Sequence, residues 1–534
     1  MRQLEAAFAA EVAAACPDLS AGYAAALPGA RSAVLGRLWR GLLYEPLPGL
    51  AAGGAGEEPG RSVVPLADGR RLSGRERRPY DLGDEPVLWL DGRPHTHPAE
   101  LLAALGLPGA DRLVTDLDHS VASLALSRAG AARHARPAHT HPGADAWDPR
   151  FGGTLADYEQ SVVDGHPYHP GCRNRPGVSV AEQLAYMPEH RPVVALDLVA
   201  LPAATCLVSG PWPASLMDGD RLLLPLHPWQ TRHVLPGLGL RPYATGAIRA
   251  RPLMSVRTLA PLDGGPHVKT AFTTRMTSDV RDISPGSVRD CVPLSRLLAE
   301  LSARRGGRPH IARYLAGAAG MVDGEHSADL SAMLREPPAT GETVLPVAAL
   351  TPELVRRPVA WLTAFARLAL ADALGLLALG AALEAHGQNL LVALGRDALP
   401  SRLIYRDLAD VRISPARLAR NGVEVPAVSA RLLSDDPAIL HAKLFGSLIG
   451  TTFASLISLL GQGDRAAESR LWDVVAVAAR ESFAELPATP DVRADRDALF
   501  GASIPVKAHL LAQLEGTPPG SGWTRVRNPL VSWI

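Results

Sequence analysis

The alternation of apolar and polar positions is most informative over residues 383–413. Apolar runs at 390–392 and 403–405 flank a polar turn, which predicts two strands joined as a hairpin after the end of a helix. Glu384 would lie at one end of this hairpin and Asp407 at the end of its returning strand, so the hairpin can bring two carboxylates together. Paired carboxylates beside phosphate are a usual way to hold Mg2+. An ordinary core hairpin with acids in its turns is the alternative.

Helical periodicity dominates the first part of the chain. Residues 1–48 are predicted to be helical, and a Gly-rich link follows over 50–60. Short strand-like pieces come next, separated by Asp-Gly turns at 68–69 and 91–92. A Pro/Gly-rich segment places a subdomain boundary near residue 146.

Two pairs of histidines precede prolines in this region. His95 and His97 open an amphipathic helix, whereas His139 and His141 lie in the Pro/Gly-rich segment. Closely spaced histidines can bind a metal ion, but no further ligand pattern accompanies either pair, so helix-capping turns are predicted instead.

The pattern then changes to strands and returns to helices. Strands are predicted at 193–201 and 221–230, and helical segments with polar linkers at 290–346. A mostly helical third segment begins at about residue 350. The most apolar stretch, 368–383, is short and contains an acid, which favours a buried core helix over a membrane span. This mixture predicts an α+β protein.

Composition adds limits to this picture. A chain of 534 residues exceeds one typical core, so two or three domains are expected. Its formal net charge is zero, which removes the global electrostatic argument for binding nucleic acid or an anionic membrane. Any anionic ligand must therefore be held by a local cluster of positive charge.

Cysteine usage and the first residues suggest a compartment. The four cysteines are scattered without metal-binding spacing, which indicates reduced thiols and no disulfide framework. Glu5 and Glu11 interrupt the apolar run at the N-terminus, so this segment fits neither a signal peptide nor a membrane span. A cytoplasmic protein is expected.

A candidate cluster of positive charge lies in the middle of the chain. Alternation places Ser255 and Arg257 on one face of a strand, with Lys269 on the returning strand. Thr277 and Arg281 fall at one end of it, where a helix could start. Three cations and several hydroxyls could together neutralise a triphosphate. The alternative is a polar sheet face with paired charges.

A second cluster lies on a proline-fixed loop. The loop carries His166, His169, Arg173 and Arg175, which could form an anion site. A surface loop with solvated arginines is the alternative. Near the end of the chain, Lys507 follows a proline at a predicted helix start, where it could reach an anionic substrate or be solvated.

No glycine-rich phosphate-binding motif is present in the sequence. If the chain binds a nucleotide, it must do so with side chains.

Seven blocks taken together resemble the IucA/IucC family, the siderophore synthetases that work independently of nonribosomal peptide synthetases. The blocks occur in family order between residue 165 and about residue 511, and they read GHPYHPGCRNRPG, LLPLHPWQ, SVRTL, HVKTAFTTRMTSDVR, EAHGQN, YRDL and PVKAHLL.

The resemblance implies a cradle-like fold with three subdomains and ATP in the cleft between the second and third. These are a helical thumb (1–146), fingers with a mixed antiparallel sheet (147–348) and a largely helical palm with the central hairpin (349–534). It implies that a carboxylic acid, citrate or a related acid, attacks ATP to give an acyl adenylate and pyrophosphate. An amine or hydroxyl then displaces AMP. A homodimer is also implied.

The resemblance assigns roles to residues in the matching blocks. ATP would be held by Ser255, Arg257, Thr258, Lys269, Arg281, His386 and Asn389. The substrate carboxylate would meet Thr277, Arg281, His386 and Lys507. Glu384 and Asp407 would hold Mg2+, and His386, Arg281 and Lys269 would act in catalysis. The family usually carries lysine where this chain has Arg173, which keeps the charge but changes the geometry.

Two other functions are carried as alternatives. An acid-His-Asn stretch followed by a strand and an aspartate also resembles the Mg-ATP site of a phosphotransferase. A non-catalytic binding protein derived from a synthetase is the second alternative, although the candidate catalytic residues are all present.

Overall fold

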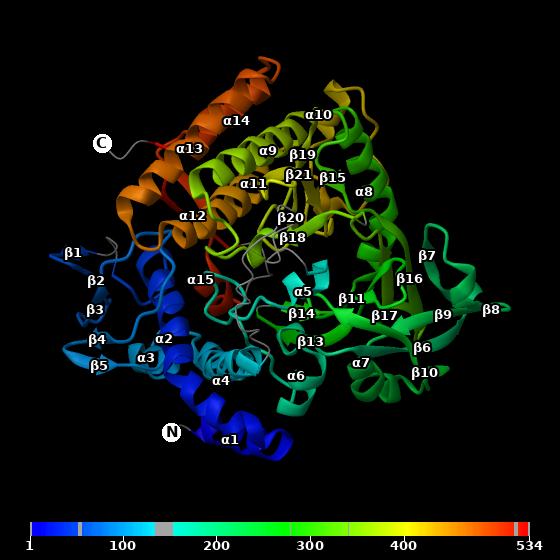
Figure 1. Ribbon diagram of the computed structural model, residues 1–534, viewed down its shortest axis with the longest axis horizontal. Helices are drawn as coiled ribbons and strands as arrows, with labels where there is room; N and C mark the ends of the chain where they lie inside the picture. Colours follow the sequence, from blue (N-terminus) through cyan, green and yellow to red (C-terminus); the bar gives the residue numbers. More distant parts are fainter. Residues whose placement is uncertain are drawn as a thin grey trace, which may run out of the picture.

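A computed structural model describes residues 3–51, 56–133, 153–277, 279–339, 341–516 and 522–531. Its helices and largely antiparallel sheets confirm the predicted α+β class. Three parts of the chain are visible in Figure 1: a blue helical part with a small sheet, a green part with a large sheet, and a yellow-to-red part rich in helices. The predicted boundary near residue 146 and the pair His139 and His141 lie outside the described residues.

The N-terminal part packs helices on a small sheet. Two helices confirm the prediction for residues 1–48, and the Asp-Gly turns separate strands as expected. Trp39 is fully buried between the helices and the sheet, where its Nε1–H donates to the carbonyl oxygen of Arg75 at 3.0 Å. The elements are α1 (Gln3–Ala15), α2 (Ser20–Tyr44), β1 (Gly56–Glu58), β2 (Arg61–Pro65), β3 (Arg71–Arg75), β4 (Leu88–Leu90), β5 (Arg93–His95), α3 (Pro98–Leu105) and α4 (Asp111–Arg133).

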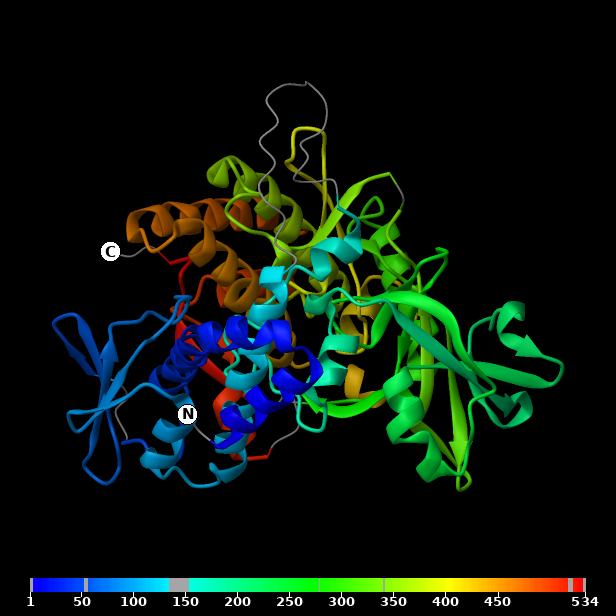
Figure 2. The same ribbon diagram turned by 60° about the horizontal axis from the view of Figure 1, so that its bottom comes forward.

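The middle part is organised around a nine-stranded sheet. This part is green and lies on the right of Figure 2. The predicted strand at 193–201 belongs to this sheet, and so does the one at 221–230 as far as Leu226, whereas residues 228–230 begin a helix. In spatial order its strands are β7 (Leu207–Ser209), β16 (Tyr314–Val322), β17 (Glu325–Arg335), β12 (His267–Thr270), β11 (Thr258–Pro261), β10 (Ala244–Pro252), β6 (Val194–Pro202), β9 (Arg221–Leu226) and β8 (Met217–Asp218).

The prediction of helical segments and linkers over 290–346 is confirmed at its start, where a helix reaches Ala303, and is wrong where strands follow. β16 and β17 form a long antiparallel hairpin, and β17 also pairs with β12. Ala332, fully buried, faces Ala318 on one side and Thr270 on the other. Pairing on both edges inside a sheet overrides the helical preference of the alanines, because strand formation depends strongly on packing context.

Shorter elements connect the large sheet to its neighbours. They are α5 (Leu155–Glu159), α6 (Val180–Tyr186), α7 (Pro228–His233), the hairpin β13 (Phe272–Met276) and β14 (Asp279–Arg281), and α8 (Pro285–Ala303).

The third part confirms the predicted central hairpin. β20 (Leu390–Leu394) and β21 (Pro400–Tyr405) pair antiparallel, with Leu390 opposite Tyr405. β15 (His310–Ile311) and β18 (Thr343–Pro346) complete a four-stranded sheet. Two strands of this sheet come before the predicted subdomain boundary at 348 and two come after it. The division into three subdomains therefore stays a prediction.

Helices surround this hairpin and fill the third part. Within the described residues, two helices are long and apolar enough to cross a membrane, Pro358–Leu379 and Pro437–Gly461, and both are mostly buried inside the protein. The elements are α9 (Pro358–Leu379), β19 (Ala381–Ala382), β22 (Arg412–Ile413), α10 (Pro415–Arg420), α11 (Pro437–Ser447), a π-helix (Leu448–Phe453), α12 (Ala454–Gly461), α13 (Arg465–Ala484), α14 (Pro490–Leu499), β23 (Ser503–Lys507), α15 (His509–Leu514) and β24 (Trp523–Arg527).

Phe365 on α9 offers a test of this core. Its ring stacks on Trp361, with centroids 5.3 Å apart, and meets Phe453 edge to face at 5.4 Å. Phe365→Ala should lower the free energy of unfolding by about 3–5 kcal/mol, because the cavity left behind adds to the lost burial. Chemical denaturation measures this change. The exposed Val359→Ala on the same helix should stay within about 0.5 kcal/mol, and equal losses would contradict the packing described.

Candidate functional site

A cavity of about 1050 Å³ lies where the three parts meet. This volume suits a nucleotide together with a small acid. Of the residues predicted for the site, all except Thr258 line it. Thr258 is only 2% exposed and pairs with Lys269 across β11 and β12, so we expect no direct contact between its side chain and a ligand.

Glu384 is held at the cavity wall by two lysines. Its Oε1 accepts from Lys507 Nζ at 2.9 Å and from Lys443 Nζ at 3.0 Å, while its backbone N–H donates to the Tyr405 hydroxyl at 3.0 Å. Burial alone would raise the pKa of the Glu384 carboxyl, but Lys507 and Lys443 hold it well below its ordinary value. Glu384 is therefore ionised.

His386 lies next to Glu384, with its Nε2 4.0 Å from Glu384 Oε2. Its Nδ1 accepts from the backbone N–H of Gln388 at 3.3 Å, and burial lowers the pKa of the imidazole. The ring is consequently neutral and carries its hydrogen on Nε2. Asn389 braces the same turn, since its Nδ2 donates to the Glu384 carbonyl oxygen at 3.3 Å.

Asp407 forms a second carboxylate centre. Its Oδ1 accepts from Lys269 Nζ at 2.8 Å and from the Tyr314 hydroxyl at 3.2 Å, and Lys269 Nζ also donates to that hydroxyl at 3.1 Å. Asp407 has φ of 63°, a conformation that costs energy outside glycine and is enriched at functional sites. Burial lowers the pKa of Lys269 to about 8 even though Asp407 opposes this shift.

Ser255 and Arg257 occupy a turn, which corrects the predicted strand. Val256 between them has φ of 66°, and the Arg257 N–H donates to the Ser255 carbonyl oxygen at 2.8 Å. The tight turn places both residues before β11 and at the cavity. The Arg257 guanidinium donates to the carbonyl oxygen of Asp282.

Thr277 and Arg281 also differ from the expected helix start. Thr277, with φ of 62°, follows β13, and Arg281 ends β14, whereas the helix begins at Pro285. Arg281 Nη2 donates to the Met276 carbonyl oxygen at 2.9 Å. Burial, and next the charge of Arg257, lower the pKa of Arg281 to about 10. Cations held close together without enough counter-charge favour binding of an anion.

The loop arginines are held by protein atoms. Arg173 donates from Nε to Val163 O and from Nη2 to Val162 O, both at 2.7 Å, and Arg175 Nη1 donates to Glu189 Oε1 at 2.7 Å. Both side chains are buried, so the alternative of a solvated surface loop is wrong. Both residues also line the cavity, so the anion site predicted for this loop stays a prediction.

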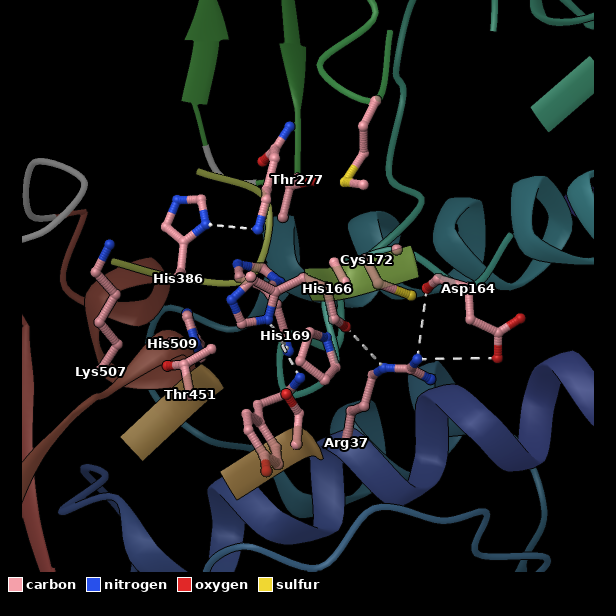
Figure 3. A pocket seen from close by; sticks show the side chains of 18 of the residues that line it. Arg37, Asp164, His166, His169, Cys172, Thr277, His386, Thr451, Lys507 and His509 are labelled. Carbon is pink, nitrogen blue, oxygen red and sulfur yellow. Dashed lines mark hydrogen bonds and ion pairs between the residues drawn. The ribbon is translucent and has the colours of Figure 1, made fainter. Parts of the chain in front are cut away.

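Three imidazoles gather at one wall of the cavity (Figure 3). The ring centroid of His509 lies 4.8 Å from that of His166 and 4.8 Å from that of His169. Nδ1 of His166 accepts from the backbone N–H groups of Tyr168 and His169, and Nδ1 of His169 accepts from that of Gly171. Burial lowers the pKa of all three imidazoles, that of His169 to about 3, so this wall is neutral.

The two carboxylates fit a magnesium ion. Both are ionised, and hard oxygen ligands of this kind are what Mg2+ prefers. The lysines contact Oε1 of Glu384 and Oδ1 of Asp407, and among the described residues no hydrogen bond reaches the second oxygen of either carboxylate. Each carboxylate therefore keeps an oxygen for a ligand.

Another group of metal-ligating side chains occurs in the thumb-like part. Glu5, His97 and Asp118 place their ligand atoms within 4.8 Å of one another. Nδ1 of His97 accepts from Ala99 N–H, which confirms the predicted helix-capping turn. Because Nδ1 accepts, Nε2 donates to Glu5 Oε1 at 3.1 Å, so neither ring nitrogen of His97 has a free lone pair for a metal ion.

Lys443 and His509 belong to the site but were not predicted from the sequence. Lys443 is buried in the apolar helix α11. A lysine among apolar residues is the sequence signal that could have identified it as a site residue, because lysine is rarely buried without a partner. His509 lies within the PVKAHLL block. Lys507 does reach an anion, Glu384, but it ends β23 and does not start a helix as predicted.

Comparisons with known proteins agree over most of the chain. Residues 154–352 match the model of the IucA / IucC family, and residues 359–518 match the model described as ferric iron reductase FhuF-like transporter. Staphyloferrin A synthase from Staphylococcus aureus is 25% identical over 413 residues, covering 67% of this chain and 70% of the relative. D-ornithine--citrate ligase from the same organism is 20% identical, covering 70% and 69% respectively.

Solved structures show the same fold. The petrobactin biosynthesis protein AsbB from Bacillus anthracis superposes with a TM-score of 0.75 at 18% identity, over 96% of this chain and 98% of that one. The ATP-bound aerobactin synthetase IucA from Klebsiella pneumoniae gives 0.73 at 19% identity, over 94% and 99%.

Proposed function

We propose that this chain, a member of the IucA/IucC family of siderophore synthetases, uses ATP to join a carboxylic acid to an amine or hydroxyl. Family membership confirms the resemblance predicted from the sequence. The observation that carries the proposal is one cavity that holds two ionised carboxylates, each paired with lysine, beside two arginines. The names of the relatives, which include a citrate ligase, support an acid of the citrate type.

In the first step a carboxylate oxygen of the acid attacks the α-phosphorus of ATP. The bond from that phosphorus to the bridging oxygen breaks, and pyrophosphate leaves with its electron pair. The acid and the triphosphate repel each other, so Arg257, Lys269 and Arg281 would screen both during approach. When bound by Glu384 and Asp407, Mg2+ would supply further charge neutralisation.

His386 suits the α-phosphate or the carboxylate. Because its neutral ring carries the hydrogen on Nε2, it would donate a hydrogen bond to an oxygen that gains negative charge. Ser255, Thr277 and Asn389 would add neutral polar contacts to the ATP and acid positions from the turns that hold them.

In the second step the nitrogen of a neutral amine attacks the acyl carbon. The bond from that carbon to the phosphate oxygen breaks, AMP leaves, and the nitrogen loses a proton. An acyl adenylate needs little further activation, but water must be kept from competing with the amine.

Pyrophosphate release with Mg-ATP tests the proposal. The acids would be citrate, succinate, α-ketoglutarate and a succinylated diamine, each with and without a pool of amines. Acid-dependent pyrophosphate with AMP, lost in Glu384→Ala, is the expected result. ADP in place of AMP would favour a phosphotransferase, and binding of ATP without turnover of any acid would favour a non-catalytic descendant.

A further inference from the structure

A buried carboxylate at the end of α2 caps α15 from a distant part of the sequence. Glu45 Oε1 accepts from the N–H of His509 at 3.0 Å, and Oε2 accepts from those of Leu510 at 2.7 Å and Leu511 at 2.9 Å. The first N–H groups of a helix have no partner inside the helix, so an external acceptor is required when they are buried. Glu45, 6% exposed, supplies it.

Two further contacts join the same elements. A Cβ on Gly41 would lie 2.3 Å from Leu510 Cδ1, so glycine on α2 lets α15 approach this closely. The Thr524 hydroxyl of β24 donates to the carbonyl oxygen of Tyr44 at 2.9 Å. The last turns of α2 therefore fix both α15 and the strand that follows it, and the blue and red elements meet in Figure 1.

α15 carries part of the neutral wall of the cavity. His509 and Gln513 line the cavity, and Gln513 Nε2 lies 2.9 Å from His169 Nε2. On the other side of the cluster, Arg37 of α2 donates from Nε to the carbonyl oxygen of His166 at 3.1 Å, as drawn in Figure 3. One helix thus supports both halves of the histidine cluster.

The neutral wall suits the amine. An amine must be neutral to attack, and the neutral imidazoles can accept hydrogen bonds from it, whereas Lys269, Arg257 and Arg281 of the same cavity would attract the acid and ATP. Nδ1 of His166 and Nδ1 of His169 already accept backbone N–H groups. His509 makes no ring hydrogen bond within the part of the chain that the structure describes, so one of its nitrogens can accept from the amine.

We propose that Glu45 is a positioning residue for the second step, because its cap on α15 holds His509 and Gln513 where the amine is received. This rests on the proposed ligase function. The side chains expected to bind the phosphates lie on other elements. Lys507 is held by the pairing of β23 with β24. Loss of the cap should therefore slow transfer to the amine more than formation of the adenylate.

The test compares Glu45→Ala and Gly41→Ala with the wild type. Asp464→Ala is the matched control, because Asp464 caps the surface end of α13 through two N–H groups and lies outside the cavity. Hydroxylamine is small enough to react without contacts to the amine-binding residues. It traps the adenylate and therefore reports the first step. A polyamine substrate reports the complete reaction.

We expect Glu45→Ala to lower amide formation with the polyamine about tenfold to a hundredfold while hydroxylamine trapping falls less than about threefold. Gly41→Ala should also lower amide formation more than hydroxylamine trapping, as Glu45→Ala does. Asp464→Ala should leave the ratio of the two rates unchanged. An equal fall in both rates, or no fall in either, would overturn the positioning role.

Hydrogen exchange gives a readout that does not depend on turnover. The backbone amides of residues 509–511 should exchange faster in Glu45→Ala and at the wild-type rate in Asp464→Ala. Unchanged protection would overturn the proposal even if the enzyme were active. A wild type that releases no pyrophosphate with any acid would instead count against the ligase function, so the two failures are distinguishable.

Discussion

Glu384→Gln should lower acid-dependent pyrophosphate release by about a thousandfold, equivalent to about 4 kcal/mol of transition-state stabilisation. The substitution keeps the shape of the side chain but removes the charge that Lys443, Lys507 and a magnesium ion would share. Initial rates at increasing Mg2+ measure the effect, and the concentration needed for half-maximal rate should rise. Chelation with EDTA should abolish wild-type activity.

The control for Glu384 must also be a buried acid held by two basic side chains. Asp495 is 2% exposed and accepts from Arg417 and His441, away from the cavity. Asp495→Asn should reduce stability, since breaking a buried ion pair costs about 3–5 kcal/mol, yet the folded fraction should keep its rate. Similar rates for Glu384→Gln and Asp495→Asn would show that Glu384 has only a structural role.

Local patterns were enough to predict the hairpin around Glu384 and Asp407. Its apolar runs alternate with turn residues over a short span, so neighbouring positions decide the structure. The carboxylates indeed line one cavity. Their lysine partners come from α11, β12 and β23, which the sequence alone could not bring together. Sequence separation hides such contacts, as with Lys269 and Asp407, 138 residues apart.

Other predictions failed where tertiary context overrides local preference. β17 contains several small residues whose helical tendency is outweighed by pairing on both edges. Ser255 and Arg257 were assigned to a strand because alternation continues across Val256, although that residue has positive φ. Such a conformation is rare for a β-branched residue and has no sequence signature.

Lys269→Met should reduce kcat/KM for ATP by about a hundredfold, because methionine keeps the length of the side chain and removes the cation that would stabilise the phosphates. Lys269 is 2% exposed and fixed by two oxygens, so no other lysine can replace it without rearrangement. Steady-state kinetics with ATP as the varied substrate measure the loss.

Tyr314→Phe provides the companion variant. It removes one hydroxyl from the same cluster but leaves the ion pair between Lys269 and Asp407. A loss of about tenfold is expected, at the low end for hydrogen bonds to charged groups, because Lys269 and Asp407 keep each other as partners. If Tyr314→Phe were as damaging as Lys269→Met, the geometry of Asp407 and not the charge of Lys269 would be the important factor.

The capping of α15 by Glu45 also affects when the cavity can form during synthesis of the protein. Folding during translation proceeds from the N-terminal end, so α2 is made long before the helix that it caps. Until residues 503–527 emerge from the ribosome, Lys507 and His509 are missing from the cavity and Glu45 has no N–H partners. A nascent chain therefore holds an incomplete cavity, and we expect ATP turnover to begin only when this late segment joins the first helices.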